Sequence, residues 1–339
     1  MNETVSIIIP IYNGEAYIDP CVENLVKQSY DQIEIILVDD GSEDDSLKKC
    51  MMWERKDGRV HVFSQKNKGV GAARNLGLEN STGSYIGFVD IDDICDLEMY
   101  SRMVQIMAKD DADIVYCGYN RCFLSENRVK CQYGKLSGPV DRIEAVKQLK
   151  SVNYDCGACN KLFRRKVILE KGGGIRKFST EYPIGEDYLW MLYTLKGSNK
   201  ISLLQECLYN YNMIQGSASH SLLLDKKNLL HLYALRDCIR VARTIREDLG
   251  SDPMLRLYGQ ARILRLLAYC KKNTQYMRKI NELIQSLDCE STWFWSKEVS
   301  KISKMKQTFM NCVYKLGLDG KYALWIYNLK RRDKLCLEE

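Results

Sequence analysis

The sequence predicts an α/β fold in which a mostly parallel sheet is flanked by helices, with a helical C-terminal region. Two observations predict it. Strand-like and helix-like stretches alternate through about the first 120 residues, and from about residue 221 the apolar residues recur at helical spacing instead. With 339 residues, 45% hydrophobic and 28% charged, the chain can form a large globular domain with an appendage. We therefore expect one domain over residues 1–220 and a helical region over residues 221–339.

The first two strands are placed by runs rich in β-branched residues. Val5 to Ile9 is one such run, which ends at Pro10, and Ile33 to Val38 is another. The stretch from Tyr17 to Gln28 between them has helical periodicity. This succession predicts a β-α-β unit with two parallel strands.

The same alternation continues along the chain. Val60 to Ser64 and Tyr85 to Val89 are predicted as strands, with a helix from Ala72 to Glu79 between them. Ile114 to Tyr119 is a further strand, and a mixture of helix-like and strand-like segments runs from Ile143 to Leu208. We expect the α/β domain to end shortly after these segments.

Helical patterns dominate the C-terminal region. They run from Leu223 to Leu249, from Met254 to Lys271 and from Tyr276 to Leu287, with a break at residues 250–253. Further on, nine basic and four acidic residues between Lys301 and Glu339 give that tail a charge of +5. Aromatic residues at 322–329 precede its basic cluster, which suits either an anionic membrane surface or a helix that packs on the catalytic domain.

The composition predicts the cellular location of the protein, the redox state of its cysteines and one class of partner that it does not bind. No run of about eighteen apolar residues occurs, and the chain starts with polar residues rather than a signal peptide, so we expect a cytoplasmic protein. It would be peripheral on the inner membrane face if the tail contacts the membrane rather than the catalytic domain. Fourteen cysteines scattered through such a chain are expected to be mostly reduced. The net charge of +6 is too small to predict binding to nucleic acid.

Polar residues follow three of the predicted strands at the point where each strand ends. Residues 10–15, 39–44 and 90–93 occupy these places, and they include several carboxylates and Tyr12. Ligands of open parallel sheets bind at the carboxyl ends of the strands. The sequence therefore predicts a carboxylate-rich pocket with an aromatic wall at this edge.

Asp90 and Asp92 are candidate metal ligands. In an extended segment the side chains of residues i and i+2 point the same way, so both carboxylates can reach one hard cation such as Mg²⁺ or Mn²⁺. The alternative is a solvated acidic turn or a helix N-cap. Asp39 and Asp40 have the same alternative, although a carboxylate beside Tyr12 could accept a hydrogen bond from a stacked nucleobase.

A glycine-containing segment at Gly69 to Arg74 precedes the helix at residues 72–79. It lacks the third glycine of a dinucleotide-binding fingerprint and does not follow the first strand, so we reject that interpretation. Arg74 could still reach an anionic donor from the start of the helix. The alternative is a helix cap with a surface arginine.

Taken in order, four motifs resemble those of the family 2 glycosyltransferases, which have the GT-A fold. They lie at residues 5–13, 37–44, 67–75 and 88–93, and a looser likeness extends to about residue 220. The resemblance implies a UDP-sugar donor. It assigns nucleotide binding to Pro10, Tyr12, Asn13, Glu15, Asp40, Arg74, Asp90 and Ile91.

The resemblance also implies the catalytic groups. Asp90 and Asp92 would hold Mn²⁺ or Mg²⁺, and His220 lies in a loop from which some relatives supply a further metal ligand. Asp187, in the segment Gly185-Glu186-Asp187, corresponds to the general base. From the residues alone, Asp187 could equally complement the dipole of a helix, and His220 could be an exposed loop residue.

One further segment departs from the family pattern. Residues 159–165 resemble a family segment, but Cys159 stands where an aromatic residue is common, which leaves the role of the segment open. Cys156 and Cys159 form a lone Cys-x-x-Cys without the second pair that a zinc site needs.

The resemblance implies an inverting transfer to a hydroxyl of a saccharide acceptor, and two alternative functions remain open. Bacterial relatives often extend lipid-linked saccharides for capsule or other surface polysaccharides. A nucleotidyltransferase would carry a Gly-rich basic loop after the first strand, where this chain has Pro10 to Asn13. A degenerate scaffold or sugar-binding protein would not need Asp90, Asp92 and Asp187.

Overall fold

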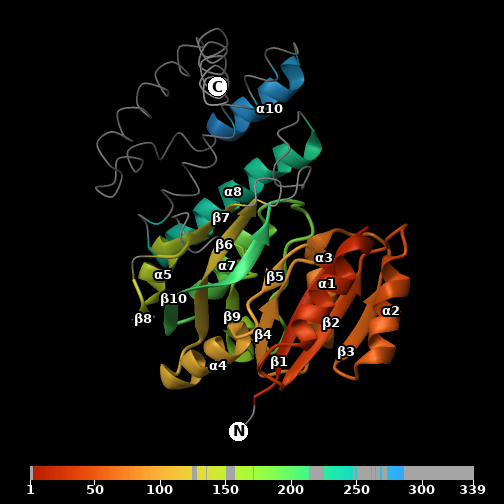
Figure 1. Ribbon diagram of the computed structural model, residues 1–339. Coiled ribbons are helices and arrows are strands. Elements are labelled where there is room, and N and C mark those ends of the chain that lie inside the picture. The colour runs from red at the N-terminus through yellow and green to blue at the C-terminus, as the bar shows by residue number, and fades with distance from the viewer. Residues whose placement is uncertain are drawn as a thin grey trace, which may run out of the picture.

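The computed structural model describes residues 3–123, 128–134, 136–149, 157–170, 172–213, 225–246 and 273–285, together with Leu249, Ala261, Leu264 and Ala268. These residues form a ten-stranded sheet with helices on both faces (Figure 1). The predicted α/β class is confirmed.

The N-terminal strands form the parallel part of the sheet. They are β1 (Val5–Ile11), β2 (Ile33–Asp39), β3 (Val60–Ser64) and β4 (Tyr85–Phe88), in the order β3-β2-β1-β4. Each neighbouring pair is parallel. β1 and β2 are buried along their whole lengths, as expected for strands covered by helices on both faces.

The second half of the sheet is mixed rather than parallel. β9 (Lys161–Arg164) lies between β4 and β6 (Ile114–Phe123) and is antiparallel to both. β6 is parallel to β10 (Ile201–Asn212), which pairs with β5 (Ile94–Cys95) in the antiparallel sense. The expectation of a mostly parallel sheet therefore holds for the first four strands and fails beyond them, because short antiparallel strands need no crossover helix and leave little periodic signal.

Two smaller strands and the remaining helices complete the described fold. β7 (Arg128–Gln132) pairs with β6, and β8 (Gly138–Val140) pairs with β10. The helices are α1 (Glu15–Val26), α2 (Ser46–Lys56), α3 (Val70–Asn80), α4 (Met99–Lys109), α5 (Arg142–Leu149), α6 (Arg165–Ile168), α7 (Glu186–Lys196), α8 (Lys226–Ile245) and α10 (Thr274–Gln285).

The sheet separates two hydrophobic cores. Buried side chains of α1, α2 and α4 pack on one face, and those of α3, α5, α7 and α8 pack on the other. Because α3 and α7 share a face, side chains near their N-terminal ends can meet above the carboxyl ends of β1 and β4. α8 packs on α7 and crosses the region above β6 and β7 in Figure 1.

Two of the predicted C-terminal helices coincide with α8 and α10, whereas most of the predicted helix at residues 254–271, and the tail from residue 301, lie outside the described residues. Cys131 and Cys207 form a disulfide between β7 and β10, and seven other described cysteines are free. Within the described ranges, no helix is long and apolar enough to cross a membrane.

Candidate active site

The loops after β1 and β2 are joined into one polar edge. The backbone N–H of Asn13 donates to Oγ of Ser42 at 3.0 Å, and the N–H of Glu43 donates to Oδ1 of Asn13 at 2.8 Å. Asn13 adopts the left-handed conformation, with φ of 49°. Beside it Tyr12 is 49% exposed, so its ring presents a free face at the carboxyl ends of β1 and β2.

The other residues predicted near Tyr12 are distributed around the same edge. Pro10 lies within buried β1, and Glu15 opens α1 with its N–H donated to Asp44 at 3.1 Å. Ile91 reaches this edge from the loop after β4, because a Cβ on Gly14 would lie 3.2 Å from its Cγ2. The structure thus brings the loops after β1, β2 and β4 together.

Asp40 is buried and holds the loop that precedes α3. Its Oδ1 accepts from Nε2 of Gln65 at 2.7 Å and from the N–H of Lys68 at 2.9 Å, and its Oδ2 accepts from the N–H of Gly69 at 2.8 Å. A carboxylate has about four acceptor positions, which leaves one for a ligand N–H. Contact between Asp40 and a nucleobase stays a prediction.

The aspartates after β4 lie close enough to repel one another. The pKa of Asp92 is raised by burial and by the negative charge of Asp90. A divalent cation between the two carboxylates would relieve this repulsion, and oxygen ligands suit Mg²⁺ or Mn²⁺. No cluster of three or more His, Cys, Asp or Glu ligands occurs in the described part of the chain, and His220 lies outside it.

Asp93 is a site-supporting residue that the sequence analysis did not identify. Its buried carboxylate accepts from the Tyr209 hydroxyl at 2.6 Å and from the N–H of Asn212 at 2.8 Å. Burial, together with the charges of Asp90 and Asp92, raises its pKa to about 9. The Asn212 amide also donates to the backbone oxygen of Asp92 at 2.6 Å, so the end of β10 fixes the acidic loop.

Arg74 is buried rather than exposed to a ligand. Its Nη2 donates to Oδ1 of Asp90 at 2.9 Å, and its Nη1 donates to Oε1 of Glu186 at 2.8 Å. Burial lowers the pKa of Arg74, but the charges of Asp90 and Glu186 outweigh it, so the pKa lies above its ordinary value. Direct contact between Arg74 and a donor stays a prediction.

The Glu-Asp pair opens α7. Gly185 is in the left-handed conformation, with φ of 88°, and precedes the first turn, where Glu186 is buried and Asp187 is half-buried. Burial and the charge of Asp187 raise the pKa of Glu186 to about 7, against the opposing charge of Arg74. A Cβ on Gly185 would lie 3.1 Å from the ring of His231, which shows how closely α8 approaches this turn.

Asn75 fixes the segment that leads to α7, a role that the sequence analysis did not assign. Its Nδ2 donates to the backbone oxygen of Phe178 at 2.9 Å, and the Phe178 N–H donates back to its Oδ1 at 2.7 Å. The Phe178 ring stacks on Trp190 of α7 with centroids 4.5 Å apart and meets Phe88 of β4 edge-on. Periodicity alone carries no signal for such a contact between distant segments.

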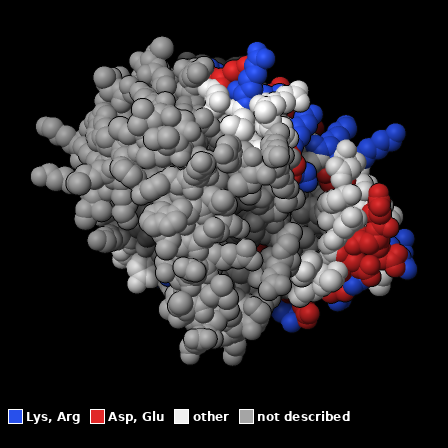
Figure 2. All heavy atoms as spheres, turned by 90° about the horizontal axis from the view of Figure 1, so that it is seen from above, with Lys and Arg blue, Asp and Glu red and all other residues white. Residues whose placement is uncertain are grey.

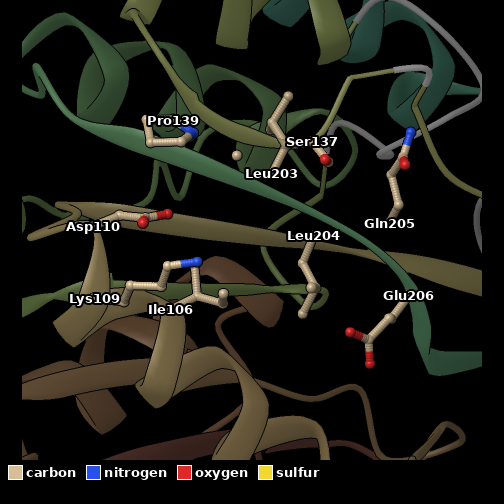
Figure 3. Close-up of a pocket in the computed structure, with 10 residues that line it drawn as sticks. Ile106, Lys109, Asp110, Ser137, Pro139, Leu203, Leu204, Gln205 and Glu206 are labelled. Atoms are coloured by element: carbon tan, nitrogen blue, oxygen red, sulfur yellow. The ribbon is translucent and has the colours of Figure 1, made fainter.

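Figure 2 views the molecule from the side of the strand carboxyl ends. Acidic side chains gather at the right, where α2 lies in Figure 1. A separate pocket of about 350 Å³ lies between α4, β8 and β10, lined by residues that include Lys109, Asp110 and Glu206 (Figure 3). None of the predicted site residues lines that pocket.

A parallel β3-β2-β1-β4 half, carboxylates after β2 and β4, and a Glu-Asp turn packed against them define the class of GT-A glycosyltransferase folds. Residues 6–170 match the family model described as Glycosyl transferase family 2. Residues 6–170 are therefore similar in sequence to the family 2 glycosyltransferases.

Two relatives named as glycosyltransferases resemble this chain in sequence, and a solved structure shares its fold. The uncharacterized glycosyltransferase EpsJ of Bacillus subtilis is 31% identical over 61% of this chain and 60% of its own length. The glycosyltransferase GlyG of Streptococcus pneumoniae is 45% identical over 35% of this chain and 40% of its own length. The chain thus spans less than two thirds of either relative. TarS of S. aureus, solved with UDP-GlcNAc, shares the fold with a TM-score of 0.58 at 17% identity, covering 84% of this chain and 92% of that one.

Proposed function

We propose that this protein is an inverting glycosyltransferase that moves a sugar from a UDP-sugar to a hydroxyl of a saccharide acceptor. The observation that carries the proposal is the ion-paired chain Asp90–Arg74–Glu186, with distances of 2.9 and 2.8 Å. It supports the proposal because it joins the acidic loop after β4 to the turn that bears Asp187. A metal site and a base must lie close together for such a transfer.

The nucleotide would bind along the edge formed by the loops after β1, β2 and β4. The exposed ring of Tyr12 suits stacking on uracil, and the remaining acceptor position of Asp40 suits an N–H of the base. The other residues proposed for nucleotide binding are Pro10, Asn13, Glu15, Arg74, Asp90 and Ile91. TarS, which shares the fold, was solved with UDP-GlcNAc, so that donor is a reasonable first substrate to test.

Asp90 and Asp92 would hold Mn²⁺ or Mg²⁺, with His220 as a further ligand. When bound, such a cation offsets the charge that develops on the departing diphosphate. Asp187 would take the proton of the acceptor hydroxyl as that oxygen attacks the anomeric carbon. The attack comes from the side opposite the departing UDP, which inverts the configuration. A positioned base of this kind contributes about 10²- to 10⁴-fold to the rate.

We further propose that the acceptor is a lipid-linked saccharide of bacterial surface polysaccharide synthesis, used at the cytoplasmic face of the membrane. The basic and aromatic composition of residues 301–339 supports a peripheral membrane contact. In this proposal residues 1–220 form the catalytic domain, and residues 221–339 contact the acceptor or the membrane. Nucleic acid has no role in it.

The test is UDP release from a panel of UDP-sugars with Mn²⁺ or Mg²⁺. We expect metal-dependent turnover by the wild type, a loss of at least about 10²-fold in Asp187→Asn, and weaker metal binding and turnover in Asp92→Asn. Asp31→Asn is a matched control, because Asp31 is exposed and precedes β2 at the opposite edge of the sheet. Turnover by both site variants at the wild-type rate would contradict the assigned roles, and no binding of any UDP-sugar would favour the scaffold alternative.

A further inference from the structure

The Arg74 side chain contacts two carboxylates and is shielded from solvent. Its side chain is 6% exposed, and its two terminal nitrogens are each taken by a carboxylate, Asp90 on one side and Glu186 on the other. The third nitrogen, Nε, is buried and has no hydrogen-bond partner among the described residues. Because the guanidinium is planar and rigid, it fixes the positions of the Asp90 and Glu186 carboxylates relative to each other.

Stability alone gives little reason for this arrangement. Glu186 is also 6% exposed, so the Arg74–Glu186 pair is removed from water on both sides. Taking two charges out of water is unfavourable, and such pairs are often no more stabilising than well-packed apolar residues. A role in positioning accounts for a charge that the core would otherwise disfavour.

Because of the packing around the first turn of α7, the position of Asp187 depends on that of Glu186. Backbone atoms of Ser179 approach α3 so closely that a Cβ on Gly71 would lie 2.7 Å from the Ser179 oxygen. On the other side, His231 of α8 lies against Gly185. The first turn of α7 is thus held between α3 and α8, and a shift of the Glu186 side chain would be passed to the backbone of Asp187 rather than absorbed.

We propose that Arg74 and Glu186 form a positioning unit that couples metal binding at the donor site to the placement of the helix that bears Asp187. The proposal rests on the function proposed above. A cation on Asp90 competes with Arg74 for the same carboxylate, so Arg74 then pairs more fully with Glu186 and fixes the start of α7. Coupling between two sites is reciprocal, so a change at Glu186 must alter metal affinity although Glu186 is not a proposed metal ligand.

The test is a double-mutant cycle on Mn²⁺ affinity in the presence of UDP, measured by titration calorimetry on the full chain. We expect Glu186→Gln to weaken Mn²⁺ binding by about 5- to 10-fold, because Arg74 then pairs more strongly with Asp90. In an Arg74→Gln background the same change at Glu186 should alter Mn²⁺ affinity by less than about 2-fold. Glu181→Gln is the matched control, because it makes the same carboxylate-to-carboxamide change at an exposed residue shortly before α7. It should leave Mn²⁺ affinity unchanged.

An equal effect of Glu186→Gln in both backgrounds would show simple charge removal and overturn the proposal, as would no effect in either. Arg74→Lys keeps the positive charge but loses the two-sided fork, so it should fold like the wild type and lose kcat at saturating donor. Unchanged kcat in Arg74→Lys would also overturn the proposal. If the wild type binds neither UDP nor Mn²⁺, the proposed function fails first and this inference fails with it.

Discussion

Asn75→Ala should destabilise the protein by an amount that the structure allows to be worked out. The Asn75 side chain and the Phe178 backbone exchange two hydrogen bonds, of 2.9 and 2.7 Å, and both residues are buried. Alanine would leave one N–H and one C=O of Phe178 without partners. Each such group costs about 1–3 kcal/mol. Allowing for local relaxation, we expect a loss of about 2–4 kcal/mol in the free energy of unfolding.

Urea denaturation followed by circular dichroism measures this loss as a lower midpoint at unchanged slope. Asn80→Ala is the matched control, because Asn80 ends the same helix, is exposed, and donates to the backbone oxygen of Leu76, one turn away in that helix, at 2.9 Å. It should change stability by less than about 0.5 kcal/mol. A loss below about 1 kcal/mol in Asn75→Ala, or one equal to that of the control, would refute the reasoning.

Three further changes test other parts of the fold. Burial raises the pKa of Glu34, but hydrogen bonds such as that from Ser6 outweigh it and leave the pKa below its ordinary value. The stability that Glu34 contributes is therefore present above the pKa it has in the unfolded state and is lost as the pH falls. Glu34→Gln should flatten the decline of the urea midpoint between about pH 5 and 3. An unchanged decline would contradict this. Gly77→Ala should cost about 1–3 kcal/mol in the same urea assay, because its Cβ would lie 2.4 Å from Cγ2 of Ile8; a stabilised variant would show that helix propensity wins. Cys131→Ser should lower the melting temperature of oxidised protein by removing its bond to Cys207, worth roughly 2–4 kcal/mol, and the difference should vanish in reducing buffer.

The parallel half of the fold was predictable because its signals are local. β1 and β2 are fully buried and rich in apolar, β-branched residues, with Ser6, Glu34 and Asp39 as buried polar exceptions, so these runs are visible in the sequence. By contrast, α2 was not predicted, because its buried residues are Ser46, Cys50 and Trp53, and most of its other positions are polar or exposed. A helix held by so few apolar contacts leaves little periodic pattern.

Sequence reasoning could name candidate site residues but not the contacts between them. Asp90 and Asp92 could be selected as candidates because they follow a predicted strand, but the expectation of an extended segment is wrong, since residues 91 and 92 lie in a turn closed by the Asp93 N–H donating to the Asp90 backbone oxygen at 3.0 Å. The burial of Arg74 depends on Glu186, which lies 112 residues further along the chain. No local pattern in the sequence predicts that these two residues come into contact. The pairing of Asp93 with Tyr209 likewise depends on the position of β10, which the mixture of short segments before it did not define.

The position of β9 has a consequence for how the chain is made. β9 lies between β4 and β6, although it follows both in the sequence. During synthesis from the N-terminus, β3, β2, β1 and β4 can pair as soon as they emerge, but one edge of β4 stays open until residues 161–164 have left the ribosome. An open, apolar strand edge is a template for wrong pairing. The nascent chain therefore passes through an interval of more than seventy residues in which its sheet is vulnerable to aggregation.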